Sequence, residues 1–496
     1  SLVALAQYFG LAGEAIPSGT VVAGTMVNKN LLTAALILML PFALYSLFVD
    51  RGEWRMLSMA AVLLGGVVIG IVRNRGALVA VGAATIVVVI FSLWQGKELF
   101  PASIRRVYLK RVMALVGAAL VIVVLATVAT RTRTEAVPRL KWGLRSSQAS
   151  IEARLEMWKR TLPMIGEHPL LGVGAGNWKI LLPKYGLEYL PAASGRVHYV
   201  RPHNDFLWVL AETGPGGFVG YVGIFLLGLW YAFRIVTRSS NPPVRLLGLL
   251  LGGGLIAYLA VSLVSFPRER IAHSVLMMTS LAILTVVYHK TFPYPQKAGE
   301  KRSPGIRLIL GATIPVLLAA AVVGSIRIHM EIHANHARAA RSKAEKISDP
   351  ARKAAYLQYA LQELTIAESP LANMDPMVTP LAHYRGECWV GLGNLSKAFE
   401  EFQNAYRLHP YHLLVLSQLA VCYQKLGNSE KSIELFRKVL TIAPANEHVR
   451  INLAAIYYHQ GKYQEAYQVI SKCDPRSNNP RLIQLRQALA AKLGAP

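Results

Sequence analysis

The sequence predicts an all-α protein in two parts: a polytopic helical membrane domain, residues 1–328, followed by a solenoid of helical repeats, residues 329–496. Three observations support this. Only 16% of the residues are charged and 53% are hydrophobic, whereas about a quarter of the residues of a soluble chain are charged. Apolar runs of about 20 residues, long enough to cross a hydrocarbon core, recur along the first part. The last part is polar and repeats every 34 residues.

Eight apolar segments are candidate membrane spans: 31–49, 57–72, 77–94, 112–129, 216–235, 246–266, 272–288 and 306–326. The loops between them fall into two sets by charge. Four alternate loops (50–56, 95–111, 234–245 and 289–307) hold 15 basic residues, and two short loops on the opposite side (73–76 and 267–271) hold four. The positive-inside rule places the first set in the cytoplasm. The long loop 130–205 and the C-terminal repeats are therefore expected on the outer side.

The C-terminal repeats place the same kinds of residue at fixed steps of 34. They are Trp389, Tyr423 and Tyr457; Gly393, Gly427 and Gly461; Ala398, Ser432 and Ala466; and Pro410 and Pro444. This spacing resembles the tetratricopeptide repeat. Helices from about 330 to 380 are expected to extend or cap the array. Because such solenoids bind polypeptides on their concave face, a protein partner is expected there, with a rigid spacer as the alternative.

The cysteines Cys388, Cys422 and Cys473 form neither a CxxC pair nor a zinc-binding pattern. The first two lie one repeat apart, and we interpret them as small core residues. The opening residues SLVALAQYFG are expected to be the tail of a hydrophobic segment that begins before this sequence.

Arginines gather at the predicted outer ends of the spans: Arg73, Arg75, Arg268 and Arg270. A charge at a membrane boundary is costly unless it is paired or functional. Arginine stays charged and binds phosphate oxygens through two parallel hydrogen bonds. Several arginines at one outer surface therefore predict a diphosphate clamp. Anchoring to lipid headgroups is the alternative.

The long outer loop contains a predicted helix that Ser150 can cap. Its apolar stripe, at helical spacing, consists of Ile151, Leu155, Trp158 and Leu162. Arg154 lies beside this stripe, which is expected to face the membrane or the bundle. The segment GVGAG (172–176) does not predict a nucleotide loop, because no strand precedes it.

The stretch RPHNDFLWVLAETGPGG, residues 201–217, predicts a short apolar helix that runs into a glycine-rich break. Arg201, His203, Asn204 and Glu212 are its candidate site residues. Asn204 is expected to cap the helix, and Glu212 either pairs with an arginine of the bundle or contacts a substrate. Taken alone, an interfacial histidine such as His203 is usually a structural residue.

Four motifs stand in the order seen in bacterial O-antigen ligases and in their relatives, the O-antigen polymerases and protein O-oligosaccharyltransferases. They are GTMVNKN (24–30), RNRGA (73–77), RLEMWKR with HPLLGVGAGNW (154–178), and RPHNDFLWVLAETGPGG (201–217). The resemblance covers roughly residues 1–290. The chain departs from the family pattern at Asn74, where a serine is expected, and it lacks the family's early spans.

This resemblance implies an inverting, metal-independent transferase in a bacterial inner membrane, with the repeats in the periplasm. It would move a glycan from an undecaprenyl-diphosphate carrier to an acceptor hydroxyl. His203, Arg75 and Arg154 are the implied catalytic residues: the arginines stabilise the leaving diphosphate, and the histidine orients or deprotonates the acceptor. The implied substrate-binding residues are Arg73, Arg201, Asn204, Glu212, Arg268 and Arg270. No cofactor, metal ion or nucleic acid is expected; the implied partners are the lipid-linked glycan, a lipid or protein acceptor, and membrane lipids.

The acceptor stays open within this family: lipid A-core, another glycan chain or a protein. Solenoid repeats favour a protein slightly, by analogy of fold alone. Functions of other classes compete. A transporter or flippase would need polar or charged residues near the middle of its spans, or broken helices in paired halves. These spans contain glycines but almost no charges near their middle. A non-enzymatic, membrane-anchored repeat scaffold would not require arginines at the outer ends. A metal-dependent oligosaccharyltransferase would require paired acidic residues, whereas the outer loops are basic.

Overall fold

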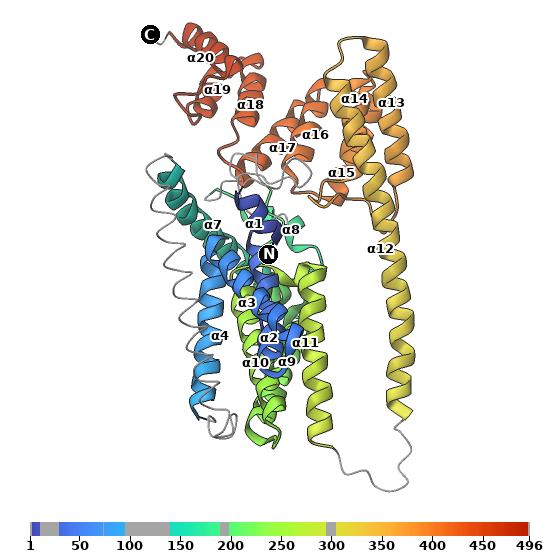
Figure 1. Ribbon diagram of the computed structural model, residues 1–496. Helices are drawn as coiled ribbons and strands as arrows, with labels where there is room; N and C mark the ends of the chain where they lie inside the picture. Colours follow the sequence, from blue (N-terminus) through green and yellow to red (C-terminus); the bar gives the residue numbers. More distant parts are fainter. Residues whose placement is uncertain are drawn as a thin grey trace. The chain divides into compact units, whose positions relative to one another are not determined.

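The computed structural model describes residues 2–9, 29–72, 74–94, 139–188, 198–293 and 304–494, and the regular elements in these ranges are helices (Figure 1). The predicted fold class is therefore confirmed. The chain divides into two compact units that do not follow the sequence order. Unit 1 comprises Ser1–Arg154, His168–Val173 and Arg201–Gln296. Unit 2 comprises Leu155–Glu167, Gly174–Val200 and Lys297–Pro496.

Unit 1 is built around a bundle of apolar helices. They are α1 (Leu2–Phe9), α2 (Lys29–Val49), α3 (Gly52–Val72), α4 (Arg75–Trp94), α9 (Asp205–Arg238), α10 (Pro242–Ser262) and α11 (Ile271–Thr291), with the short 3-10 helix η5 (Pro267–Glu269). All but α1 and η5 are long and apolar enough to cross a membrane, as is α12 (Pro304–Glu345) of unit 2. These helices account for seven predicted spans, and the remaining one, 112–129, lies outside the described residues. The chain is a multi-pass membrane protein.

Helix α10 forms the centre of this bundle, because 72% of the residues in its apolar stretch are buried. Its Tyr258 stacks on Phe225 of α9 with ring centroids 5.6 Å apart. Gly254 approaches α2 so closely that a β-carbon there would lie 2.7 Å from Pro41 Cγ. Small residues that let helices approach are typical of membrane bundles. The glycine run of α10 therefore serves helix packing.

Helix α9 contains the predicted short helix, the break and the following span as one element. The break is at Gly214, whose φ of 65° and ψ of −173° are not helical. The predicted span started at residue 216, whereas α9 starts at Asp205. The difference arises because the short apolar helix before the kink and the span after it form one continuous element.

Unit 2 contains the repeats together with part of the long loop. Its elements are the second half of α7 (Arg139–Glu167), α8 (Trp178–Leu181), η3 (Leu182–Tyr185), α12, α13 (Pro350–Ala367), α14 (Leu381–Gly391), α15 (Leu395–Leu408), α16 (Leu413–Lys425), α17 (Ser429–Ile442), α18 (Glu447–His459), α19 (Tyr463–Ile470) and α20 (Pro480–Leu493). Helices α14 to α19 form three antiparallel pairs of the predicted period. The periodic glycines Gly393, Gly427 and Gly461 have φ of 76°, 84° and 75° at the turns. The periodic small residues Ala398, Ser432 and Ala466 are fully buried.

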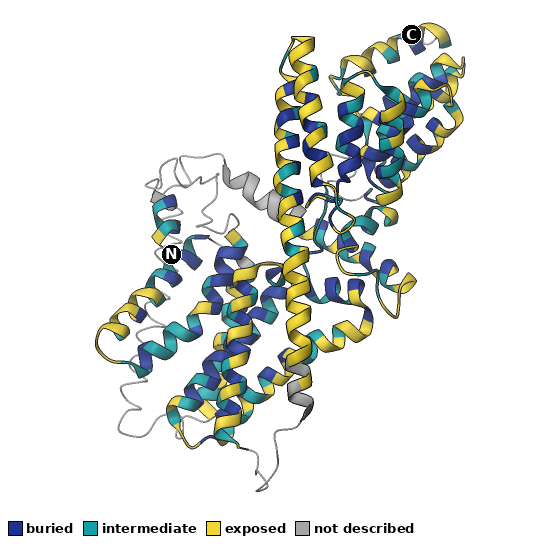
Figure 2. Cartoon of the chain, turned by 90° about the vertical axis from the view of Figure 1, so that its right-hand side faces the viewer, coloured by how far each residue is buried: buried dark blue, intermediate teal, exposed yellow. Residues whose placement is uncertain are grey.

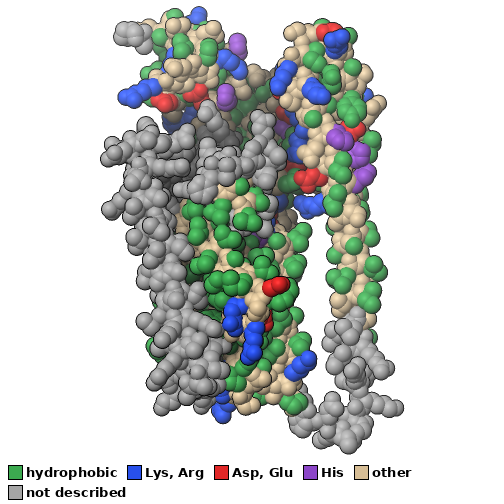
Figure 3. Space-filling model, in the orientation of Figure 1, with side chains coloured by type: hydrophobic (Ala, Val, Ile, Leu, Met, Phe, Trp, Pro, Cys, Tyr) green, Lys and Arg blue, Asp and Glu red, His purple; other side chains and the backbone are tan. Residues whose placement is uncertain are grey.

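Helix α12 runs from an apolar segment into the repeats without a break, so the predicted boundary at 328/329 falls inside a helix. The apolar part of α12 is exposed on all sides (Figure 2). In Figure 3, hydrophobic side chains cover this part, and charged side chains gather on the repeat helices. An apolar surface of this kind suits contact with lipid.

The described residues 174–188 and 198–200 of the long loop pack on the repeats. The backbone N–H of Leu187 donates to the carbonyl of Ile442 at 2.8 Å. The ring of His198 stacks on that of His412, with centroids 5.0 Å apart. The sequence-based division assigned this loop to the membrane domain, and no sequence pattern indicated its packing on the solenoid.

Candidate functional site

One end of the bundle in unit 1 collects the predicted site residues, and we call it the α9 end because α9 starts there. His273 Nε2, at the start of α11, lies 2.8 Å from the carbonyl oxygen of Leu31 at the start of α2. Gly76, at the start of α4, lies against Val264 after α10, since a β-carbon at Gly76 would be 3.1 Å from Val264 Cγ2. Helices α2, α4 and α11 therefore start at this end, and α10 ends there.

Asn74, the departure from the family pattern, fixes the start of α4. Its Oδ1 accepts a hydrogen bond from the backbone N–H of Ala77 at 3.3 Å, and its Nδ2 donates to Thr33 Oγ1 at 2.6 Å. Asparagine caps helices as well as serine does. Arg75 is the first residue of α4. The side chain of Arg75 lies outside the described part of the chain, as does all of Arg73.

The two glycine-rich motifs of the sequence contact each other through their backbones. The N–H of Val173 donates to the carbonyl of Ala211 at 2.9 Å. A β-carbon on Gly172 would lie 2.6 Å from that same carbonyl oxygen, and one on Gly214 would lie 2.2 Å from the carbonyl oxygen of Leu170. Both glycines also have positive φ, 67° and 65°. Only glycine satisfies both conditions. Sequence reasoning did not pair these motifs, although each has a glycine directly at a helix break.

The first turn of α9 holds His203 in an uncommon conformation. Asn204 caps the helix, because its Oδ1 accepts from the backbone N–H of Leu207 at 3.0 Å. His203, directly before this cap, has φ of 57°, a left-handed value that is rare outside glycine and concentrated at functional sites. Its ring contacts Phe266 edge to face, with centroids 4.9 Å apart. Its Nδ1 is buried and has no hydrogen-bond partner among the described residues.

Two of the candidate arginines are paired with carboxylates. Arg201 forms a two-pronged ion pair with Glu269, with an Nη2–Oε1 distance of 2.7 Å. The guanidinium of Arg268 lies 3.4 Å from Asp205 Oδ1 and 3.6 Å from Glu212 Oε2. The pairing of Glu212 with an arginine of the bundle is one of its two expected roles. Both arginines also cover aromatic rings, Arg201 at 4.8 Å from the centre of the Phe266 ring and Arg268 at 4.3 Å from that of Trp208.

Arg154 differs from these two arginines. Within the part of the chain that the structure describes, no carboxylate lies within salt-bridge distance of its guanidinium. Burial lowers the pKa of Arg154. Its positive charge also acts on His203: burial first, then the charges of Arg154 and Arg201, lower the pKa of His203 to about 4. A half-buried cation that no carboxylate of the described residues neutralises therefore acts on a neutral imidazole.

This arrangement can bind an anion and accept a proton. No carboxylate of the described residues neutralises Arg154, and the start of α9 adds the positive end of a helix dipole. The imidazole of His203 is uncharged near neutral pH, so it can accept a proton from a hydroxyl. Arg270 is exposed at the N-cap of α11. The sequence analysis did not single out Asp205, Trp208, Phe266 or Glu269, because their roles depend on pairing between separate segments.

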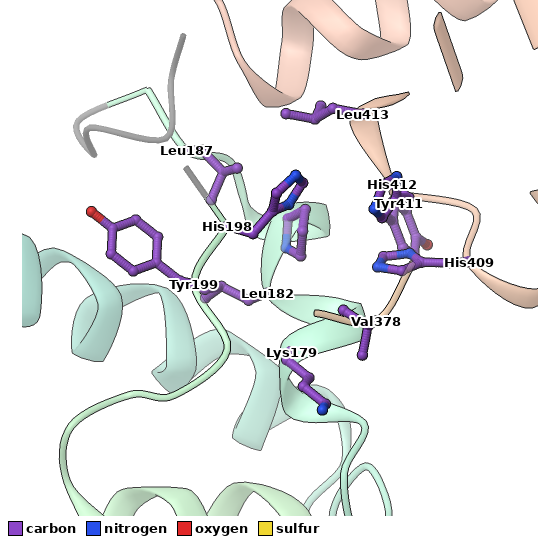
Figure 4. A pocket seen from close by; sticks show the side chains of 11 residues that line it. Lys179, Leu182, Leu187, His198, Tyr199, Val378, His409, Tyr411, His412 and Leu413 are labelled. Carbon is purple, nitrogen blue, oxygen red and sulfur yellow. The ribbon is translucent and has the colours of Figure 1, made fainter. Parts of the chain in front are cut away.

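A small pocket lies within unit 2, between the loop and the repeats (Figure 4). Its lining includes His198, His409 and His412, whose rings face one another, together with Lys179 and Leu187. It encloses about 20 Å³, room for one water molecule. The pocket is therefore a packing seam, too small for a glycan.

Comparisons with known proteins agree with the two-part organisation. Residues 59–222 match the family model described as O-antigen ligase, and residues 427–489 match a tetratricopeptide-repeat model. The first match includes the arginines at 73, 75, 154 and 201 and His203, and ends before Arg268. No curated protein matches the chain.

Among solved structures, one match is a crystal structure from Podospora anserina described as putative kinesin light chain nearly identical TPR-like repeats. The identity is 20%, and the match covers 34% of this chain and 87% of the other, with a TM-score of 0.28. So low a score adds nothing to the repeat motifs and the repeat model. The chain thus joins a membrane segment that matches the O-antigen ligase family to C-terminal tetratricopeptide repeats.

Proposed function

We propose that the protein is a glycosyltransferase of the O-antigen ligase type, which transfers a glycan from a lipid-diphosphate carrier to an acceptor hydroxyl. The α9 end would face the periplasm and the helices would span a bacterial inner membrane, as the distribution of basic loops predicts. The observation that most supports this is Arg154, which pairs with no carboxylate among the described residues and whose charge acts on the neutral His203. A diphosphate is an anion that would complete this site.

The reaction would be a single displacement that inverts the anomeric carbon. The acceptor oxygen attacks that carbon and forms the new glycosidic bond, while the bond from the carbon to the diphosphate oxygen breaks with its electron pair. The acceptor proton passes to His203. Arg154 and Arg75 stabilise the negative charge that develops on the leaving diphosphate, a preorganised electrostatic effect that needs no metal ion.

The donor itself would tune the histidine. In the structure, burial first and then the charges of Arg154 and Arg201 lower the pKa of His203, and an imidazole with a pKa of about 4 is a weak base. A bound diphosphate would offset the contribution of the two charges and raise the pKa of His203, which would make it a stronger general base. The base would thus gain strength only when the donor is in place.

The remaining predicted residues would bind or position substrate. We propose that Arg73 and Arg270 contact the donor directly, and that Arg201 and Arg268 act from their ion pairs. Asn204 and Glu212 would hold the first turns of α9, on which His203 is mounted. The repeats would recruit a protein, either the acceptor or a partner.

The test is glycan transfer in a strain that lacks the protein and is complemented with variants. We expect wild type to restore transfer, and His203→Ala, Arg75→Ala and Arg154→Ala each to lower it by about 100-fold, the size of losing one transition-state contact. Lys159→Ala is the matched control, because Lys159 lies on α7 near Arg154 and is exposed. Membrane levels of each variant are measured alongside.

The products identify the acceptor, because glycosylated lipopolysaccharide, glycan chain length and glycoprotein are followed together. Loss of the first indicates a ligase, loss of the second a polymerase, and loss of the third a protein O-oligosaccharyltransferase. If all three variants transfer as well as wild type, the arginines are headgroup anchors and the scaffold interpretation replaces the enzyme.

A further inference from the structure

The hairpin of α12 and α13 in unit 2 carries histidines on one helix face. His329, His333 and His336 follow one another by four and three residues, so they lie on one side of α12. Figure 3 shows histidine side chains gathered in this region of the hairpin. Neither the proposed reaction nor the repeat pattern uses these residues.

The two helices are held rigidly against each other beside these histidines. Alanines along α12, including Ala334 and Ala337, are fully buried against Ala360 and Leu364 of α13, which are also fully buried. Small residues on both helices bring the backbones close together. Side chains that meet across this seam are therefore preorganised, as a ligand site requires.

Two of the histidines approach the same carboxylate oxygen of Glu363 on α13. His333 Nδ1 lies 2.8 Å and His336 Nδ1 3.2 Å from Glu363 Oε2. One ligand atom from each of the three residues lies within 4.8 Å of the others. The hydroxyl of Tyr359, one turn earlier on α13, also hydrogen-bonds the carboxylate of Glu363.

We propose that His333, His336 and Glu363 bind a divalent transition-metal ion, with Zn²⁺ as the best fit. Two imidazole nitrogens and one carboxylate oxygen are ligands that zinc uses at about 2.0–2.2 Å. Neighbouring ligand atoms of a tetrahedral zinc site are about 3.3 Å apart at these bond lengths, close to the 2.8 and 3.2 Å separations here. The fourth position faces solvent and would hold water, and Tyr359 would orient the carboxylate from outside.

An ion pair alone explains this arrangement less well than a metal. One carboxylate can neutralise one imidazolium, yet both histidines point Nδ1 at the same oxygen atom. A bound dication would be held by Nδ1 of each neutral histidine, whose single proton would then be on Nε2, and would give all three groups one shared partner. The ion would fasten α12, just after its apolar segment, to the first helix of the solenoid. The inference does not depend on the proposed transferase activity.

The test is metal binding by the full-length protein in detergent, prepared without a histidine tag and stripped with a chelator. Titration with Zn²⁺ alone is followed by calorimetry, and with Co²⁺ by the visible absorption typical of tetrahedral sites. We expect one ion per chain and a higher Tm in its presence, because the ion binds only the folded state. Glu363→Gln and His333→Ala should each weaken binding by more than about 10-fold, the smallest loss seen even for outer-shell partners.

Two controls keep the result unambiguous. His448→Ala removes an exposed histidine from α18, so binding should be unchanged. Glu363→Gln keeps a side-chain carbonyl that can accept a hydrogen bond, and circular dichroism of the metal-free variant checks that it folds. The proposal fails if stoichiometric binding is absent in wild type, or if it persists unchanged in folded Glu363→Gln.

Discussion

At the scale of single residues, the α9 end holds two arginines that already have carboxylate partners and a third that has none among the described residues. Arg201 and Arg268 have carboxylate partners, whereas Arg154 has none among the described residues. An internal partner would compete with an incoming anion, so of these three arginines Arg154 is the one that could bind an anion directly. The same charge acts on its neighbour His203, which in the proposed reaction would link anion binding to proton transfer.

The pH dependence of turnover tests this link. The pKa of His203 is about 4 in the free protein, so kcat/KM should stay constant from pH 7 to about pH 5 and fall only below that, because protonation removes the base. The acid limb of kcat should lie at higher pH, since kcat reports the donor-bound enzyme. Both are measured with detergent-solubilised enzyme and a lipid-diphosphate donor. Activity at pH 7 after exposure to acid controls for unfolding, and two limbs that coincide near pH 6.5 would contradict the coupling.

The sequence identified Arg154 and His203 but not their surroundings. Motif order indicated both residues, because each lies in a distinctive local pattern. The partners of Arg201 and Arg268 are Glu269 and Asp205, which lie 68 and 63 residues away from them. Pairing over such separations is decided by helix packing, which local patterns do not report.

At the scale of elements, the contact between segment 168–173 and the kink of α9 fixes the site. The kink leaves the carbonyl of Ala211 available to Val173. Hydropathy predicted the spans, because length and apolarity are local properties. It divided α9 into a short apolar helix, a break and a span, because the glycine-rich break interrupts the apolar run.

Two glycine substitutions distinguish the effect of a close backbone contact on activity from the effect of a strained, positive φ. Gly172→Ala and Gly176→Ala both place a side chain at positive φ, 67° and 83°, which costs about 1 kcal/mol in either case. Only Gly172 has backbone atoms within 2.7 Å of the added carbon, whereas nothing lies within 4 Å at Gly176. We expect Gly172→Ala to abolish most transfer activity and Gly176→Ala to retain most of it. Equal activities at equal membrane levels would show that this contact does not shape the site.

At the scale of the whole molecule, the loop and the repeats share a seam of buried histidines. Burial, then the charge of His198, lowers the pKa of His409 to about 4, and burial lowers that of His412 to about 2. His383 faces the same cluster, and Asp375 and Glu387 are the acidic residues whose charges act on it. The seam is therefore packed with neutral imidazoles.

Acid should weaken unit 2 through these residues. A folded pKa below the usual 6.5 means that the unfolded chain takes up the proton first. Stability is then complete above pH 6.5 and falls as the pH drops towards 4, by about 2 kcal/mol at pH 5 from His409 alone. We expect the fall in Tm of the full-length protein between pH 7.5 and 5 to be smaller in His409→Phe than in wild type. His448→Phe, at an exposed site, should fall as much as wild type, and an equal fall in all three proteins would exclude this role for His409.

The chain crosses between the units four times within the loop, after Arg154, Glu167, Val173 and Val200. The repeats are therefore not an interchangeable accessory. A chimera that exchanged only the C-terminal residues would remove the carbonyl of Ile442 that Leu187 binds and the ring on which His198 stacks. The transplantable piece is unit 2 as a whole, Leu155–Glu167, Gly174–Val200 and Lys297–Pro496, three stretches separated in sequence. Lineages that acquired or lost such repeats would have had to remodel the loop at the same time.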